Sequence, residues 1–338
     1  MCDSGLVIRL LMAFNADMKY QELMDKMNQL MWVLCIEAIC LPVSTQQDVS
    51  PTERLNKLIS KSDLARKIGE SNKLDPDLIQ LVTIPSRKVC IKNYIGESAL
   101  GKIYDGEIAG RKINLRDIGD HEISNIKRAA IISNVIRHCD YILRIYGVCE
   151  LNGCNYIVSE YVSHTNTLRN ILNTNKQLSI RRAVEYSLCI AQALEYIHKC
   201  NIIHKDIRTN NVYLTSDGYI KLTGFEMSRS KFNPTVRFAN MDSFVKKWWA
   251  PEKLLGKGDS FACDVYSFGN LMWELITGDV PFANYMTNEA TYKIISGQRE
   301  TFPQNTFQPY VDIIIKCWNH NPNQRPSMSE LTEMLERC

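Results

Sequence analysis

Hydrophobic residues recur at intervals of three and four in the first part of the chain. Between residues 17 and 41 they are Tyr20, Leu23, Met24, Met27, Leu30, Met31 and Leu34. This spacing places them on one face of a helix, which either packs against the rest of the protein or binds a partner. A second helix is predicted to begin at Ser50, because Pro51 suits the first helical turn and Glu53 completes a capping box with Ser50. We therefore expect residues 1–85 to form a helical segment of their own.

After Pro85 the pattern changes to short apolar runs that are typical of strands. The predicted strands are Lys88–Ile95, Lys102–Ile108, Arg111–Ile118, Ile142–Cys149 and Tyr156–Tyr161. A helix from about Ile123 to Arg137 separates the third strand from the fourth. Beyond Thr167 the pattern is mostly helical, with one short strand-turn-strand around Asp217-Gly218. This order predicts a small β-rich part followed by a larger helical part.

Composition and charge exclude several classes of protein. The 338 residues are 45% hydrophobic and 23% charged, which are the fractions of a folded globular chain. A net charge of +3, without any run of five or six like charges, does not favour nucleic acid as a partner. The longest apolar run, Leu30–Val43, contains Glu37 and Pro42, so no transmembrane segment is expected. The twelve cysteines form no C-x-x-C pair, which favours free thiols, no metal site and a cytoplasmic location.

Six short motifs follow one another at characteristic spacings in the second part of the chain. They are Gly96-Glu97-Ser98-Ala99-Leu100-Gly101, His204-Lys205-Asp206 with Asn211, Gly224-Phe225-Glu226, Ala250-Pro251-Glu252, Asp264-Val265-Tyr266, and Cys317-Trp318 with Arg325-Pro326. In this order they resemble the protein-kinase fold, nearer to its tyrosine-kinase-like members, over about residues 88–338. The resemblance implies an α+β, bilobal, protein-kinase-like fold over residues 86–338. A small β-rich N-lobe (about 86–160) is followed by a large helical C-lobe (about 161–338), and short helices precede them in residues 1–85.

The resemblance assigns the nucleotide site to Gly96, Ser98, Gly101 and Arg116. The glycine loop should let the backbone approach phosphate, but Ser98 stands where its middle glycine is expected. Arg116 stands where a lysine is expected on the third strand, and its planar guanidinium does not replace a compact ammonium cleanly. The glutamate that should pair with this lysine is also missing, since no acidic residue lies near Arg128–Ala130.

The site that would hold magnesium is altered as well. Gly224 stands where the resemblance implies a metal-binding aspartate, and glycine brings no ligand. Asp206 and Asn211 remain as the expected base and second metal ligand, although Asp206 suits a role in holding its loop through hydrogen bonds. On these changes we predict a pseudokinase that is not an enzyme. We expect no metal and no cofactor, apart from weak, metal-independent binding of ATP.

Other positions match residues that are structural throughout the kinase family, namely Glu252, Asp264 and Arg325. Glu252 is expected to pair with Arg325 and so to hold the end of the activation segment, residues 227–249. Four hydroxyl side chains of this segment are candidates for phosphorylation: Ser228, Ser230, Thr235 and Ser243. The candidates for binding a partner are Phe225, Glu226, Trp248 and Trp249. The two tryptophans are also typical of packing within the lobe.

The triplet Gly224-Phe225-Glu226 resembles the mixed-lineage-kinase-domain-like (MLKL) pseudokinase family, which has the same triplet at this place. The resemblance implies a domain that docks onto a receptor-interacting protein kinase, the upstream kinase of necroptosis. Residues 1–85 are too short, and with a net charge of −2 too acidic, for the membrane-permeabilising bundle of this family, and they fit its brace helices better. The chain is therefore similar to truncated viral (poxvirus-type) homologues. Such homologues sequester the receptor-interacting kinase in the host cell cytoplasm and inhibit necroptosis.

Two other functions stay open. One is a weakly active or ATP-binding kinase with an unconventional metal site, which would use Asp206, Asn211 and Arg116. The other is a truncated necroptosis effector in which residues 1–85 still kill cells. The sequence leaves the oligomeric state open as well.

Overall fold

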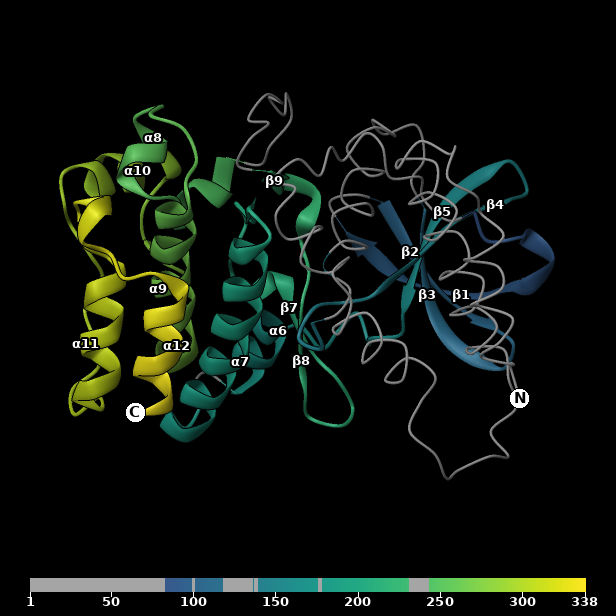
Figure 1. Cartoon of the computed structure of the whole chain (residues 1–338), viewed down its shortest axis with the longest axis horizontal. Helices are drawn as coiled ribbons and strands as arrows, with labels where there is room; N and C mark the ends of the chain where they lie inside the picture. The colour runs from purple at the N-terminus through teal and green to yellow at the C-terminus, as the bar shows by residue number, and fades with distance from the viewer. Residues whose placement is uncertain (1–82, 99–100, 118–135, 137–138, 176–177, 231–242) are drawn as a thin grey trace, which may run out of the picture.

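The protein has two lobes, a β-sheet lobe and a helical lobe, that lie side by side along its longest axis (Figure 1). The structure is a computed structural model of the chain and describes residues 83–98, 101–117, 136, 139–175, 178–230 and 243–338. The sheet lobe comes first along the chain and the helical lobe second. This division confirms the predicted α+β, bilobal fold.

Five antiparallel strands form the sheet lobe. They are β1 (Val89–Ser98), β2 (Gly101–Ile108), β3 (Arg111–Asp117), β4 (Ile145–Leu151) and β5 (Cys154–Glu160), in the spatial order β1-β2-β3-β5-β4. Alternate residues of each strand point to the same face, and Ile113, Leu115 and Val158 are buried together in the core of this lobe. β3 is therefore the central strand, with β2 and β5 on either side.

One helix that is buried along almost its whole length forms the centre of the helical lobe. α9 (Phe261–Thr277) begins after Ser260, whose side chain accepts a hydrogen bond from the Cys263 N–H, and ends at Gly278 in the left-handed conformation (φ 76°). The other helices are α6 (Leu168–Asn175), α7 (Ile180–Lys199), α8 (Pro251–Leu254), α10 (Thr287–Ile295), α11 (Gln308–Cys317) and α12 (Met328–Glu336). Its residues from Cys263 to Ile276 are buried on every side of the helix, so the rest of the lobe assembles around α9.

Short strands and single turns carry most of the motif residues. β7 (Val212–Leu214) and β8 (Ile220–Leu222) form the predicted strand-turn-strand, and β6 (Ile202–Ile203) pairs with β9 (Arg229–Ser230). The 3-10 helices are η2 (Ser86–Lys88), η3 (Thr209–Asn211), η4 (Phe225–Met227), η5 (Ser243–Trp248) and η6 (Pro322–Gln324). The loop that contains Asp206 thus lies between β6 and β7, and Gly224 follows β8.

The strand boundaries differ from the predicted ones by up to three residues. β4, for example, was predicted from Ile142 but begins at Ile145, because Ile142 forms an isolated bridge with Leu222 of the helical lobe. Residues 1–82 and most of the helix predicted near residues 123–137 lie outside the described residues, so these two predictions stay predictions. None of the helices that the structure describes is long and apolar enough to cross a membrane.

Candidate functional site

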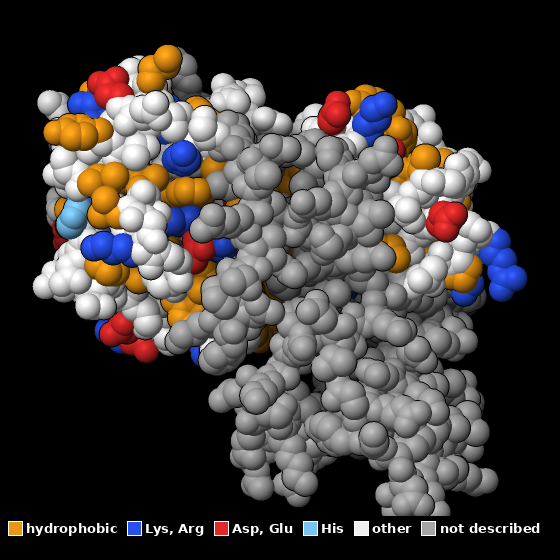
Figure 2. All heavy atoms as spheres, turned by 90° about the horizontal axis from the view of Figure 1, so that it is seen from above, with side chains coloured by type: hydrophobic (Ala, Val, Ile, Leu, Met, Phe, Trp, Pro, Cys, Tyr) orange, Lys and Arg blue, Asp and Glu red, His pale blue; other side chains and the backbone are white. Residues whose placement is uncertain are grey.

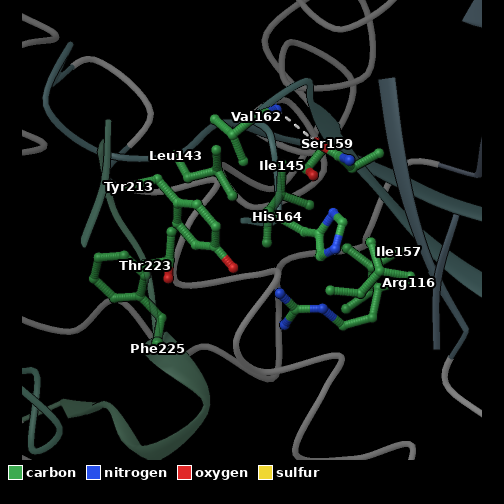
Figure 3. A pocket seen from close by; sticks show the side chains of 13 residues that line it. Arg116, Leu143, Ile145, Ile157, Ser159, Val162, His164, Tyr213, Thr223 and Phe225 are labelled. Atoms are coloured by element: carbon green, nitrogen blue, oxygen red, sulfur yellow. Dashed lines mark hydrogen bonds between the residues drawn. The ribbon is translucent and has the colours of Figure 1, made fainter. Parts of the chain in front are cut away.

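A narrow cavity of about 50 Å³ lies between the two lobes (Figure 3). The residues that line it are Ile103, Asn114, Arg116, Leu143, Ile145, Ile157, Ser159, Val162, His164, Tyr213, Thr223, Gly224 and Phe225. None of these side chains is a carboxylate, and most are apolar. Arg116 points into the cavity from β3 and brings a positive charge (Figure 3). The cavity therefore suits a ligand with an apolar part and an anionic part.

Gly96 near the end of β1 and Gly101 at the start of β2 are needed for the packing of the sheet lobe itself. A Cβ at Gly96 would lie 2.6 Å from His164 Cδ2, so glycine lets β1 approach the segment that follows β5. Gly101 has φ 126°, and a Cβ there would collide with the carbonyl oxygen of Asp117. Ser98 lies on β1 between them, but its side chain is outside the described residues.

A buried carboxylate holds the loop that contains Asp206. Asp264, in the first turn of α9, accepts hydrogen bonds from the backbone N–H groups of His204 (2.8 Å) and Lys205 (2.9 Å), and its Oδ2 lies 2.9 Å from His198 Nε2. Burial alone would raise the pKa of Asp264, but the contact with His198 and these donors hold it below its usual value. These contacts keep Lys205 in the left-handed conformation (φ 75°), which is costly for a residue with a side chain.

Asp206 is oriented by two neighbours from the same loop. Asn211 Nδ2 donates hydrogen bonds of 2.7 Å to both the backbone oxygen and Oδ2 of Asp206. Arg208 Nη2 donates to Oδ2 at 3.2 Å, and Arg208 Nε lies 2.8 Å from Oδ1 in an ion pair without hydrogen-bond alignment. Asp206 and Asn211 were predicted from motif spacing, whereas Arg208 was not. Its part in the site depends on the loop conformation, for which motif spacing carries no signal.

Gly224 has a left-handed conformation (φ 86°) directly beside Asn211. A Cβ here would lie 2.5 Å from Asn211 Nδ2, and that nitrogen, a donor, is directed at Asp206 and not available as a ligand. In the part of the chain that the structure describes, no group of three or more His, Cys, Asp or Glu side chains could hold a metal ion. The side chain of Glu226 is outside the described residues. The residues present do not fit the magnesium site that the kinase resemblance implies.

Two of the residues assigned to partner binding lie inside the protein. Phe225 is 4% exposed and Trp248 is 2% exposed, and Trp248 Nε1 donates a hydrogen bond of 2.9 Å to Glu274. Trp249 is half-buried, with Lys253 Nζ 4.2 Å from its ring centroid. This corrects the assignment for Phe225 and Trp248, which pack in the helical lobe and do not form a surface.

The candidates for phosphorylation differ in their exposure. Ser228 is fully buried, and its hydroxyl donates a hydrogen bond of 3.0 Å to the carbonyl oxygen of His204. A kinase does not reach such a hydroxyl in this conformation, which corrects the assignment of Ser228. Ser243 is exposed and stays a candidate, whereas Thr235 and the side chain of Ser230 lie outside the described residues.

Two carboxylates, the partly buried Glu252 and the buried Glu274, lie next to the end of the activation segment, where Glu274 accepts the hydrogen bond from Trp248. Glu252 pairs with Arg325, as expected from the sequence, through contacts of 2.6 and 2.9 Å. Burial raises the pKa of Glu252, but Arg325, together with hydrogen bonds from the Glu252 backbone and Cys263, holds it below its usual value. The structural role of Glu274 was not predicted from the sequence. It is fully buried, which raises its pKa, and it binds Arg169 (3.2 Å) and the hydroxyl of Thr209 (2.7 Å).

The sequence pattern of the family described as "Protein tyrosine and serine/threonine kinase" matches residues 89–335 of the chain. The chain belongs to the protein kinase family. The match extends over both lobes and includes the Asp206 loop, Arg116 and Gly224. The kinase resemblance inferred from the six motifs is therefore confirmed, whereas membership of the MLKL family and a viral origin are finer statements that this match does not test.

Several curated proteins are similar to the chain. A probable serine/threonine-protein kinase of Dictyostelium discoideum is 27% identical over 271 residues, covering 78% of this chain and 54% of that protein. Probable serine/threonine-protein kinase SIS8 of Arabidopsis thaliana is 27% identical over 281 residues, covering 80% of this chain and 27% of that protein. Mitogen-activated protein kinase kinase kinase 13-A of Xenopus laevis is 25% identical over 272 residues, covering 80% of this chain and 28% of that protein. The chain thus spans about half, or less, of the length of these relatives.

The prediction that this chain is not an enzyme is wrong. A kinase family pattern that matches both lobes, together with relatives named as serine/threonine kinases, points to a catalytic kinase domain. The prediction rested on Arg116, Gly224 and the missing glutamate near residues 128–130. The first two substitutions are present as described, and residues 128–130 lie outside the described part of the chain.

Proposed function

We propose that this domain is a protein kinase that binds a nucleoside triphosphate between its lobes and transfers the terminal phosphoryl group to a hydroxyl of a protein. The observation that carries the proposal is the arrangement of Asp206, which Asn211 and Arg208 hold in place. Asn211 in turn lies against Gly224, which lines the cavity that Arg116 enters. The family match and the kinase relatives support this class of reaction. The identity of the substrate protein is open.

Arg116 would bind the phosphates. It lies on the central strand β3, opposite Ile103 of β2 and Ile157 of β5, and its side chain points into the cavity (Figure 3). A guanidinium keeps its charge at physiological pH and donates from a planar fork that matches phosphate oxygens. Arginine thus preserves the attraction for phosphate at this position, although not the geometry of a lysine.

Asp206 would orient the acceptor hydroxyl and take up its proton as the new P–O bond forms. The bond between the terminal phosphorus and the bridging oxygen breaks in the same step, and the nucleoside diphosphate leaves. Its Oδ2 is held by Asn211, so the carboxylate has a fixed direction before a substrate arrives. Arg208 places a positive charge beside it, where the transferred phosphoryl group carries negative charge. Because Gly224 supplies no metal ligand, Arg116 and Arg208 would neutralise the negative charge of the phosphates. The expected rate is accordingly low for a kinase.

Transfer of labelled phosphate from ATP to a generic protein substrate tests this proposal. Asp206→Asn is expected to lower the rate by about a hundredfold or more, because an amide does not accept the proton. Asp217→Asn is the matched control, since Asp217 is exposed in the turn between β7 and β8. The proposal fails if the wild-type protein transfers no phosphate, or if Asp206→Asn transfers it as fast as the wild type does.

We also propose, as a second candidate, that the domain binds a receptor-interacting protein kinase and thereby limits necroptosis. The resemblance of Gly224-Phe225-Glu226 to the MLKL family supports it, and so does an exposed apolar surface at α10. Tyr285, Met286 and Tyr292 are 36%, 81% and 73% exposed there, and Figure 2 shows hydrophobic side chains gathered on this face of the helical lobe. Methionine and aromatic residues are enriched where proteins bind one another.

Co-purification of a receptor-interacting kinase from stimulated cells tests the second candidate. The double substitution Met286→Glu with Tyr292→Glu is expected to reduce recovery of the kinase about tenfold or more, because it places two charges on the apolar surface. Tyr94→Glu is the control, since Tyr94 is 54% exposed on β1 in the other lobe. Equal recovery with both variants would count against the α10 surface, and no recovery with the wild type would count against this partner.

A further inference from the structure

The cavity between the lobes is smaller than a nucleotide needs. Its volume of about 50 Å³ compares with roughly 300–1,000 Å³ for pockets that enclose small molecules. Two side chains of the protein reduce it, Asn114 from β3 and Tyr213 from β7. Both side chains line the cavity.

Asn114 lines the cavity on the side of Val162. Its Oδ1 accepts a hydrogen bond of 2.6 Å from the backbone N–H of Val162 (dashed in Figure 3). Val162 belongs to the connector segment, residues 161–167, which joins β5 to α6 and lines the cavity. Backbone N–H groups in such a position are the groups with which pockets orient a ligand. Here the Val162 N–H donates to Asn114 of the protein itself and not to a ligand.

The other half of the same amide has no partner. The contact with Val162 settles the orientation of the Asn114 amide, because an N–H donor requires the oxygen opposite it. Asn114 Nδ2 is then buried without a hydrogen-bond partner in the described part of the chain, and the residue is only 7% exposed. A buried donor without a partner costs stability, so stability alone does not explain an asparagine at this position.

Tyr213 fills the opposite side. Its ring points into the cavity, towards Arg116 and His164 (Figure 3). The backbone around it is fixed, because β7 pairs with β8 through Tyr213 and Lys221, and Tyr213 also forms a bridge with Thr167. The ring therefore leaves the cavity only by rotation of the side chain.

We propose that Asn114 and Tyr213 are internal substitutes for the base of a nucleotide, and that they set the affinity of the cleft for nucleotides. Asn114 takes the hydrogen bond that an acceptor atom of the base would receive from Val162, and Tyr213 takes the space of the flat ring. Both side chains turn away before a base binds. The apparent affinity is then reduced by the fraction of molecules in which the cleft is open. This inference rests on the proposed function, because it concerns the same cleft.

Calorimetric titration of the full chain with ATP and with ADP, with and without magnesium, tests the role of Asn114. Asn114→Ala is expected to tighten nucleotide binding about fivefold, because it frees the Val162 N–H for the base. Asn114→Asp is the matched control. A carboxylate oxygen still accepts the hydrogen bond from Val162, so this variant should bind no more tightly than the wild type.

The same titration tests Tyr213. Tyr213→Leu is expected to tighten binding about tenfold, because it removes the aromatic ring from the space of the base. Tyr213→Phe keeps the ring and is expected to stay within about twofold of the wild type. If thermal unfolding shows that Tyr213→Leu does not fold, Tyr213→Val replaces it, since a β-branched residue suits a strand.

The outcomes separate this inference from the proposed function. Measurable binding by the wild type that neither Asn114→Ala nor Tyr213→Leu tightens overturns the inference and leaves the proposed function intact. The inference is also overturned if Asn114→Asp tightens nucleotide binding as much as Asn114→Ala does, because the freed Val162 N–H is then not the cause of the tighter binding. The same holds if Tyr213→Phe tightens binding as much as Tyr213→Leu does, because the space left by the ring is then not the cause. If the wild type and all folded variants bind neither nucleotide, the proposed function is wrong.

Discussion

At the scale of single residues, Gly224 and Asn211 depend on each other. A Cβ at position 224 would lie 2.5 Å from Asn211 Nδ2, so the present place of Asn211 requires glycine. From that place Asn211 donates two hydrogen bonds to Asp206. Glycine at position 224, which offers no carboxylate ligand, is therefore compatible with the close contact between Asp206 and Asn211, whereas a residue with a Cβ is not.

The ion pair between Glu252 and Arg325 is expected to be a large single contribution to stability. The Arg325 side chain is fully buried, and Arg325→Leu leaves the Glu252 charge without its partner. The variant should lower the free energy of unfolding, measured by chemical denaturation, by about 3 kcal/mol or more. Arg337→Leu is the control, because Arg337 and Glu333 form an exposed pair that is worth less than about 1 kcal/mol. Similar losses in both variants would contradict this prediction.

The residues of the site that could be predicted are those that a motif identifies by type and spacing. Asp206 and Asn211 were found because a fixed number of residues separates them, and the structure brings them into contact. Asn114 and Tyr213 were missed because an asparagine or a tyrosine in a strand does not by itself indicate a hydrogen bond to the connector segment or a ring inside the cleft. Their effect on the cleft follows from the hydrogen bond to Val162 and from a side-chain direction, and both depend on how the lobes meet.

At the scale of helices and strands, hydrophobic periodicity was a good guide to the kind of element and a poor guide to its ends. Local apolar runs predicted all five strands of the sheet lobe. The start of β4 was wrong because Ile142 pairs with Leu222, a residue 80 positions further along the chain. Tertiary contacts of this kind override a local pattern, so a boundary often cannot be derived from the sequence around it.

At the scale of the whole molecule, the contacts that join the lobes also decide what the cleft can hold. The bridge between Ile142 and Leu222 and the packing of Gly96 against His164 bring the sheet lobe against the helical lobe and the connector segment. The order of the motifs predicted two lobes and a site between them. The separation of the lobes was beyond prediction, because it depends on contacts between residues that are distant in the sequence.

Acid is expected to weaken the helical lobe through its buried carboxylates. Burial would raise the pKa of Asp259 and of Asp264. Lys253 and Lys205 beside Asp259, and His198 beside Asp264, instead hold the pKa of each below its usual value. A carboxylate with a lowered pKa in the folded state stabilises the protein above its unfolded-state pKa of about 4, and this contribution disappears as the pH falls through the folded-state value.

Chemical denaturation between pH 7 and pH 3 measures this effect. The wild-type free energy of unfolding should fall by on the order of 2 kcal/mol, most steeply below about pH 4. At pH 7 Asp259→Asn should be less stable than the wild type, because the substitution removes the ion pairs with Lys205 and Lys253. This difference should shrink as the pH falls and the wild-type carboxylate becomes protonated. Glu274 acts with the opposite sign, because burial raises its pKa and its protonation favours the folded state. Asp217→Asn, in an exposed turn, is the control, and a wild-type curve that stays flat down to pH 3 would refute the prediction.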